Sequence, residues 1–391
     1  MVKAIDIPFG PQHPALEEPI NFTFEVEEER VVDVKIRLGY IHRGIEKLAE
    51  NRTYHQNVYL VERICGICSF AHTTCYTQAV EELLGVDIPE RAKYIRTIFC
   101  EMERIQNHYL WLGFTAKAMG FETLFMYTWR DREAMLEVLE MISGKRVNYG
   151  MNTIGGVRRD ITGKMVERME ERLNYLEERA NYYKKVCTKE RSILKRTVGV
   201  GMLEPSDALN LCAVGPTLRA SGIPQDVRAD EPYAAYGEIP FRVVTYDGCD
   251  VASRILVRID EITESVKMIR RALDGMPQGP IRVKVPKNVP KGEAVSLVEA
   301  PRGEDLHYLR SDGSDRPARL KVRAPTLANL PSLRKMLKGV NIADIPIVIA
   351  GIDPCLACME RVILVDTKSK KGRAWSGEEL WRYANEWYRE S

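Results

Sequence analysis

Residues 63–72 read Arg-Ile-Cys-Gly-Ile-Cys-Ser-Phe-Ala-His, and residues 353–361 read Asp-Pro-Cys-Leu-Ala-Cys-Met-Glu-Arg. Each stretch holds a Cys-x-x-Cys pair, and residues three apart in a turn or helix point the same way, so each pair forms a two-thiolate clamp. Four soft sulfurs suit zinc, an iron–sulfur cluster, nickel or copper(I). A zinc ribbon brings its pairs together within roughly 15–20 residues, whereas these pairs stand near opposite ends of the chain. The whole fold must close before the site exists, which favours a buried catalytic metal centre.

The residues around the two pairs also suit a built site. Pro354 fixes the backbone just before Cys355, and Gly66 allows close backbone approach at the first pair. Four thiolates on two divalent metals leave an electron-rich centre, which gives nearby arginines a physical reason to be there. His72, four residues after Cys68, is expected to hydrogen-bond near the site rather than bind the metal. A structural four-cysteine zinc site is the alternative reading of the spacing.

Composition limits the class of protein. The 391 residues include 57 Lys and Arg against 55 Asp and Glu, a net charge of +2, and 45% are apolar. A sizeable core can therefore form, and the balanced charge argues against a nucleic-acid partner. The longest nearly uncharged apolar stretch, 345–352, is far shorter than the roughly 20 residues that cross a bilayer. The chain is expected to be soluble, with any membrane association made through partners.

Apolar patterning and the two cysteine motifs together lead us to expect an α+β fold, with a long-helix bundle core and peripheral antiparallel strands. The metal site is expected where the N- and C-terminal cysteine motifs meet. Alternation of apolar and polar residues predicts an N-terminal β region over 1–40. Helical patterning dominates 41–275, with an insertion of loops and short strands near 214–249. A C-terminal α+β region, 276–361, ends in the second motif, and 362–391 form a tail.

Two long helices stand out in this pattern. From Met165 to Cys187 apolar residues recur every three or four positions, which predicts one continuous helix between 163 and 199 with a single buried stripe. A second helix with one apolar face is predicted over 250–273. Beyond it, proline and β-branched residues predict strands at 281–285, 294–299, 305–310 and 318–323.

The two cysteine segments resemble the metal-binding motifs of the large subunits of nickel–iron hydrogenases. Other segments are similar to the membrane-associated, energy-converting branch of that family, which is related to the quinone-site subunit of respiratory complex I. These segments are residues 10–14 (GPQHP), 38–58, 107–113 (NHYLWLG), 215–236 and 299–304 (EAPRGE). The complex I relatives lack the cysteines, whereas this chain keeps all four. That places it on the hydrogenase side of the resemblance.

The resemblance implies how a nickel–iron centre would be held. Cys65 and Cys355 would be terminal thiolates on nickel, while Cys68 and Cys358 would bridge nickel and iron. The iron would carry CO and cyanide ligands, which maturation enzymes supply.

The resemblance also implies which residues surround the metals. Arg302 would lie over the open metal position, paired with the carboxylate of Asp353. Pro301 and Thr326 would line or hydrogen-bond the cyanide ligands.

Proton transfer has its own expected residues. H₂ is a very weak acid, so heterolysis needs a Lewis acid and a nearby base, and a terminal thiolate such as Cys355 can take the proton. By resemblance Glu18 would relay that proton, with Glu17 as the adjacent alternative. Burial would raise the pKa of such a carboxyl toward the working range.

The expected function is that of the catalytic subunit of a membrane-bound hydrogenase complex, which interconverts 2H⁺ + 2e⁻ and H₂. The other five cysteines are scattered, so electrons would leave through 4Fe–4S clusters of an iron–sulfur small subunit. An odd number of cysteines without a secretion signal fits reduced thiols in a cytosolic setting. The resemblance adds membrane ion-translocating subunits, ferredoxin, a maturation protease and nickel-insertion proteins as partners. It implies a peripheral position on the cytoplasmic side of the cell membrane.

Two other readings stay open. The chain can be a complex I-like electron-transfer or quinone-site subunit without an active nickel–iron centre, or a zinc scaffold without catalysis. In many relatives a protease removes the tail that follows the position of Arg361 once nickel is inserted. Residues 362–391 are therefore expected to be removed on maturation, unless this subclass keeps them.

Overall fold

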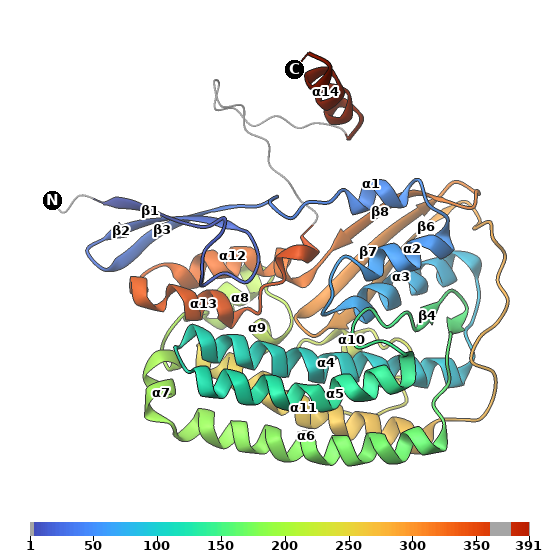
Figure 1. Cartoon of the computed structure of the whole chain (residues 1–391), viewed down its shortest axis with the longest axis horizontal. Coiled ribbons are helices and arrows are strands. Elements are labelled where there is room, and N and C mark those ends of the chain that lie inside the picture. Colours follow the sequence, from blue (N-terminus) through green and yellow to red (C-terminus); the bar gives the residue numbers. More distant parts are fainter. Residues whose placement is uncertain (1–3, 360–376, 391) are drawn as a thin grey trace.

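The structure, a computed structural model, describes residues 4–359 and 377–390. Its core is a bundle of four long helices, α4 (Glu90–Ala118), α5 (Glu122–Ser143), α6 (Gly163–Lys189) and α11 (Val251–Gly275). Both α4 and α6 pack against α5 and α11. Figure 1 shows this bundle as one layer, with small antiparallel sheets above it. The predicted α+β class with a long-helix core and peripheral antiparallel strands is confirmed.

Burial differs between the helices of the bundle. Almost every side chain of α4 is buried, which makes it the central helix of the fold. In α6 a single stripe is buried, and its members are those expected from the sequence, running from Met169 to Cys187. The prediction of one continuous helix to residue 199 was wrong. Glu190 adopts an extended backbone and its side chain caps a second helix, α7 (Arg191–Thr197), so the helix axis is broken there.

The N-terminal region forms a three-stranded antiparallel sheet in the order β1 (Ile5–Phe9), β2 (Asn21–Glu27) and β3 (Arg30–Arg37). Alternate β2 residues are buried and join the main core. The sheet packs through β3 on α12 (Pro325–Leu337). The long connection from β1 to β2 holds residues 10–20, and it brings the two glutamates of the sequence prediction to the metal site.

A second antiparallel sheet contains β6 (Gly292–Ala300), β7 (Gly303–Ser311) and β8 (Pro317–Arg323). Helix α3 (Ser69–Leu84) packs on β6 and β7, which places the start of α3 near the tight β6–β7 turn. Gly303 in that turn has a φ of +129°, and a Cβ there would lie 2.8 Å from the backbone nitrogen of Gly215. Only glycine allows this close approach.

Two local predictions were wrong. Residues 281–285 form no strand; Arg282 makes one isolated bridge with Gly156. The insertion near 214–249 contains no strand but two single turns of helix, α9 (Pro216–Arg219) and α10 (Val227–Asp230). Backbone hydrogen bonds to neighbouring loops replace the expected ladders.

The remaining elements complete the chain. They are α1 (Ile45–Ala49), α2 (Tyr54–Glu62), β4 (Asn152–Thr153), β5 (Gly156–Val157), α8 (Pro205–Asn210), η1 (Ile342–Asp344), α13 (Ile345–Gly351), η2 (Leu356–Cys358) and α14 (Gly377–Glu390). Among the described residues, no helix has the length and apolarity that spanning a bilayer requires. The division at residues 40, 275 and 361 stays a prediction. Most of the tail, 362–376 and 391, lies outside the described residues, so its removal also stays a prediction.

Candidate metal centre

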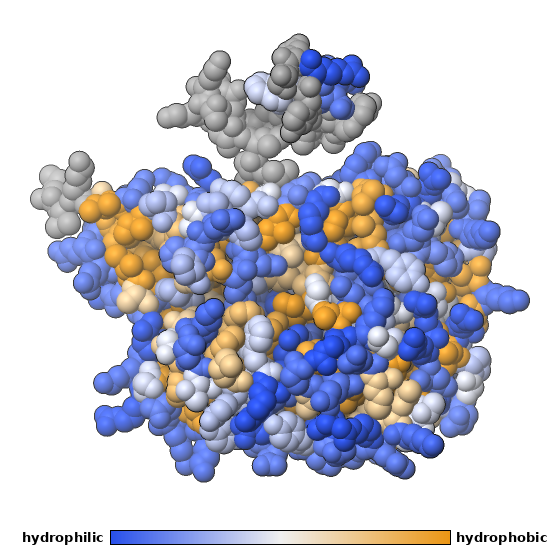
Figure 2. Space-filling view, viewed as in Figure 1, coloured by the Kyte–Doolittle hydropathy of each residue, from blue (hydrophilic) through white to orange (hydrophobic). Residues whose placement is uncertain are grey.

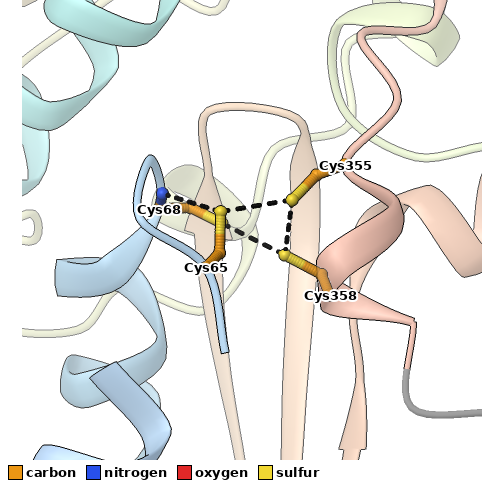
Figure 3. A group of neighbouring side chains, drawn as sticks. All are labelled: Cys65, Cys68, Cys355 and Cys358. Atoms are coloured by element: carbon orange, nitrogen blue, oxygen red, sulfur yellow. Dashed lines mark hydrogen bonds between the residues drawn. The ribbon is translucent and has the colours of Figure 1, made fainter. Parts of the chain in front are cut away.

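Four cysteine sulfurs from the two ends of the chain meet in the interior (Figure 3). The Sγ atoms of Cys65 and Cys355 lie 3.2 Å apart, and those of Cys68 and Cys358 lie 3.5 Å apart. Within the second pair the Sγ atoms are 2.9 Å apart. All four are buried and free, with no disulfide between them. The predicted convergence of the two motifs is confirmed.

The first pair lies in the short loop between α2 and α3. The Sγ of Cys65 accepts the backbone N–H groups of Ile67 at 3.2 Å and Cys68 at 3.4 Å. Hydrogen bonds from the thiols of the second pair, Cys355 first, hold the pKa of Cys65 well below its usual value, and Arg302 adds attraction. The loop is thus arranged to hold a thiolate, the form of cysteine that binds metals.

The second pair follows α13 through a constrained turn. Asp353 has a φ of +55°, a left-handed conformation that is uncommon outside glycine. The hydroxyl of Thr326, in the first turn of α12, accepts the backbone N–H of Cys355 at 3.0 Å. The structure therefore places Thr326 beside the site as a support of the cysteine backbone, while a contact with a metal ligand stays a prediction.

Arg302 and Asp353 form a buried ion pair beside the sulfurs. Nη2 of Arg302 lies 2.8 Å from Oδ1 of Asp353, and its Nε donates to the Asp353 carbonyl at 2.8 Å. Burial by itself would lower the pKa of Arg302, but Asp353 and then the cysteines raise it well above its usual value. Among the described residues, its Nη1 has no hydrogen-bond partner. The cation therefore keeps one donor free, and its charge interacts with Cys355, Cys68 and Cys65. Pro301, the buried residue before it, lies in the same turn.

Glu18 caps the turn that contains the second pair. Its Oε2 accepts the backbone N–H groups of Leu356 and, at 2.9 Å, Ala357. Burial raises the pKa of this carboxyl, although the two backbone donors lower it in part. The expected glutamate is therefore at the site and is held in a fixed orientation.

Glu17 faces a cavity of about 550 Å³ that borders the metal centre. Loss of surrounding water raises the pKa of Glu17 to about 8; Asp353 adds repulsion, and Arg302 opposes the shift. The cavity is mostly apolar and lies between the β1–β2 connection, the end of α4 and α13. Its lining includes Leu16, Glu17, Glu18, Phe22, Trp111, Phe114, Lys117, Leu333, Ile349, Pro354 and Leu356. Figure 2 shows apolar residues gathered at the end of the molecule that carries β1–β3.

Behind Cys358 lies a buried group that sequence reasoning found only in part. Nε2 of His72 is 3.5 Å from the Sγ of Cys358, as expected of a residue near the site. Its Nδ1 lies 3.2 Å from Nε2 of His307 and 2.9 Å from Oδ2 of Asp305. Asp305 and His307 stand two apart on β7 and so share a face. The alternation of residues along the strand predicts that these two side chains lie on the same side of the sheet. No local sequence motif, however, indicates that they meet His72.

Arg43 is a second residue whose place the sequence did not reveal. Its guanidinium donates to the carbonyls of Arg63 at 2.9 Å and Ile64 at 2.7 Å, just before the first pair. It also donates to the carbonyl of Ala357 at 2.9 Å, inside the second pair. One side chain thus joins the two loops that carry the sulfurs.

The residues present fit a metal centre. Four buried thiols with sulfurs between 2.9 and 3.5 Å apart form a compact soft-donor set. The free Nη1 of Arg302 supplies a positive charge against the excess negative charge of four thiolates.

Comparison with known proteins gives two family matches. The model of the 49 kDa subunit of respiratory-chain NADH dehydrogenase matches residues 118–289 and 283–361. The model of nickel-dependent hydrogenases matches residues 43–177.

Individual relatives fall on both sides of this relationship. The chain is 42% identical over 382 residues to the membrane-bound hydrogenase subunit alpha of Pyrococcus furiosus, covering 94% of this chain and 90% of that one. It is 40% identical over 356 residues to the carbon monoxide-induced hydrogenase of Rhodospirillum rubrum, covering 91% and 99%. It is 36% identical over 382 residues to a subunit of the NADH-quinone oxidoreductase of Geotalea uraniireducens, covering 91% and 98%.

A solved structure shares the fold. A chain of the membrane-bound sulfane sulfur reductase, an archaeal respiratory membrane complex, superimposes with a TM-score of 0.87 and 34% identity, covering 92% of this chain and 98% of that one. The chain therefore belongs to the family that joins the large subunits of membrane-associated, energy-converting nickel–iron hydrogenases to the quinone-site subunit of respiratory complex I.

Proposed function

We propose that this chain is the catalytic subunit of a membrane-bound nickel–iron hydrogenase that interconverts 2H⁺ + 2e⁻ and H₂. The observation that carries the proposal is the meeting of all four sulfurs of the two Cys-x-x-Cys motifs in one buried group. A family member that serves only as a quinone-site scaffold has no need for four converging free thiols next to an arginine.

Each nearby residue has a role in this proposal. A nickel–iron centre, its iron carrying CO and cyanide, would supply the Lewis acid that polarises H₂ for heterolysis. Cys65, Cys68, Cys355 and Cys358 would hold it. Arg302 balances charge above the sulfurs, and the thiolate of Cys355 takes the proton.

The proton then leaves toward the surface. Glu18 contacts the turn between Cys355 and Cys358 and borders the cavity, so its carboxyl can accept a proton on one side and release it on the other. Burial raises the pKa of Glu18 above its usual value, which favours proton uptake by this carboxyl.

Electrons require a partner. Among the described residues, no second group of three or more cysteines lies together. We therefore assign electron transfer to 4Fe–4S clusters of an iron–sulfur small subunit, with ferredoxin as the carrier. The relatives named as membrane-bound support a peripheral place in a membrane complex. We assign the chain to the cytoplasmic side of the membrane, held there by ion-translocating subunits. Insertion of nickel would use dedicated proteins and a maturation protease.

A second candidate function is a complex I-like electron-transfer or quinone-site subunit without an active nickel–iron centre. The apolar cavity beside Glu17 and the match to the 49 kDa subunit favour it.

Metal analysis of the intact matured complex separates the two functions. The hydrogenase proposal expects nickel and iron together with H₂-dependent reduction of a redox dye, and it expects Cys355→Ser to lose both nickel and activity. A matured complex without nickel overturns it. About one zinc per chain, with turnover unaffected by Cys355→Ser, would instead identify a structural zinc site.

A further inference from the structure

One turn of α4, residues 103–107, contacts three of the segments that build the candidate site. Glu103 accepts the backbone N–H groups of Phe70 at 2.7 Å and Ala71 at 2.9 Å, in the first turn of α3 directly after Cys68. Gln106 donates from its amide to the carbonyl of Ile67 at 2.9 Å, between the two cysteines of the first pair. These two side chains fix the first cysteine loop from behind.

The same turn also holds the two other segments. Arg104 donates to the carbonyls of Glu299 at 2.7 Å and Ala300 at 3.3 Å, at the end of β6 that leads into Arg302. Asn107 donates from Nδ2 to Oδ2 of Asp353 at 2.9 Å, next to the second pair.

These contacts are made in a rigid setting. The four α4 side chains are fully buried, and α4 is the central helix of the bundle. The neighbouring His108 binds Glu261 of α11 at 2.8 Å, which ties this turn to the next long helix. This turn of α4 therefore holds segments that are far apart in the sequence at fixed positions relative to one another.

Asn107 matters most because it acts on the arginine through one carboxylate. Asp353 offers Oδ1 to Arg302 and Oδ2 to Asn107, so both oxygens are fixed. The backbone of Asp353 is left-handed at a φ of +55° and needs such restraint.

We propose that Asn107 is a positioning residue, which sets the direction of the free Nη1 of Arg302 by holding Asp353. This inference rests on the proposed hydrogenase function and names a residue within it. Without the amide, Oδ2 of Asp353 loses its donor and the carboxylate can rotate about its side-chain bond. Arg302, still held at Nε by the Asp353 carbonyl, then loses the fixed partner of its Nη2, and the direction of its Nη1 changes. A displacement of about 1 Å at a reacting centre costs on the order of 100-fold in rate.

The test compares three variants in the intact complex. Asn107→Ala removes the donor, and its kcat for H₂ oxidation is expected to fall by about tenfold or more, with little change in KM. Tyr109→Phe is the matched control, because it removes a buried hydrogen bond from the same helix to the carbonyl of Leu176 in α6, away from the site. It should keep the rate of the unmodified protein.

Asn107→Asp gives a readout that a purely structural role would not produce. A carboxylate at this position repels Asp353, whereas a protonated carboxyl can donate to it as the amide does. Arg302, Arg258 and Glu17 interact electrostatically with Asp353. Nδ1 of His108, a further titratable group, lies 3.5 Å from Nδ2 of Asn107. The activity of this variant is expected to recover as the pH falls. Its pH–rate profile should therefore show a rise toward low pH that the profile of the unmodified complex lacks.

The outcomes are distinct. If Asn107→Ala turns over at the rate of Tyr109→Phe with full nickel content, or if Asn107→Asp shows no new pH limb, the positioning role is wrong. A structure of the Asn107→Ala complex decides the same point without activity, because Arg302 and Asp353 should be displaced. Absence of nickel and turnover in the unmodified complex overturns the proposed function, while that structure still tests whether Asn107 holds the pair.

Discussion

Glu18 accepts the backbone N–H of Ala357 at 2.9 Å, although 339 positions separate the two residues. The β1–β2 connection and the second cysteine turn are therefore one structural unit. The carboxyl that we propose as the proton relay thus also fixes the turn between Cys355 and Cys358.

Replacing Glu18 with Gln tests the proton relay. The amide oxygen can still accept from Ala357, so the turn and its metal content should be kept, but the side chain no longer exchanges a proton. We expect turnover to fall by about 100-fold or more, measured as H₂ oxidation in the purified complex. An unchanged rate at full nickel content would remove Glu18 from the relay.

We predict that titration of Glu17 makes the rate of H₂ production depend on pH. Its pKa of about 8 keeps the carboxyl protonated below that pH, so it can donate a proton to the site. As the pH rises through 8 the donor is lost, and the rate of proton reduction should decline. In Glu17→Gln this limb should disappear from the pH profile. A variant profile that matches the unmodified one between pH 6 and pH 9, roughly the range in which such a group titrates, contradicts the role.

We predict that replacing Arg43 weakens the retention of metal at the candidate centre. Arg43→Gln breaks the link between the carbonyls of Ile64 and Ala357. The two cysteine loops should then separate more easily, and nickel should be lost faster to a chelator. Arg63→Gln is the control, since within the described part of the chain that side chain bonds only the local Tyr59 carbonyl and Glu62. Equal chelation rates in the two variants would show that Arg43 does not hold the loops together.

We predict that replacing Asp131, which lies on α5 away from the four cysteines, lowers the stability of the fold. Its fully buried carboxylate on α5 accepts from Tyr175 at 2.7 Å and Arg179 at 2.6 Å on α6, and from Tyr183. Its Oδ1 also accepts from Nε of Arg130 at 2.8 Å. Asp131→Asn should lower the free energy of unfolding by about 2–4 kcal/mol, because charge-assisted bonds to four partners are weakened.

The urea midpoint of the purified chain measures this loss. The control is Glu133→Gln on the same helix, whose ion pair with Arg146 is exposed and is expected to contribute less than about 1 kcal/mol. A similar midpoint for both variants would mean that the buried carboxylate contributes little.

The four cysteines of the candidate metal centre could be identified from the sequence because their spacing is local within each pair. The long helices were predictable because α6 and α11 each carry one apolar stripe of constant period. The break at Glu190 escaped prediction, since the apolar stripe ends at Cys187 and a single capping side chain then decides the turn.

The supports of the site were harder to read. Arg43, Asp305 and Asn107 act across long distances in the chain, and each looks ordinary beside its sequence neighbours. Contacts of this kind depend on the packed fold, so residue type and periodicity do not reveal them.

Because 290 positions separate Cys65 from Cys355, the ribosome releases one half of the thiol set long before the other exists. The helical body between them can fold first, since domains begin to fold during synthesis. A polypeptide that ends before Cys355 has only Cys65 and Cys68 of the four converging cysteines. If the four cysteines hold the proposed metal centre, only a chain synthesised through Cys358 can be loaded with metal.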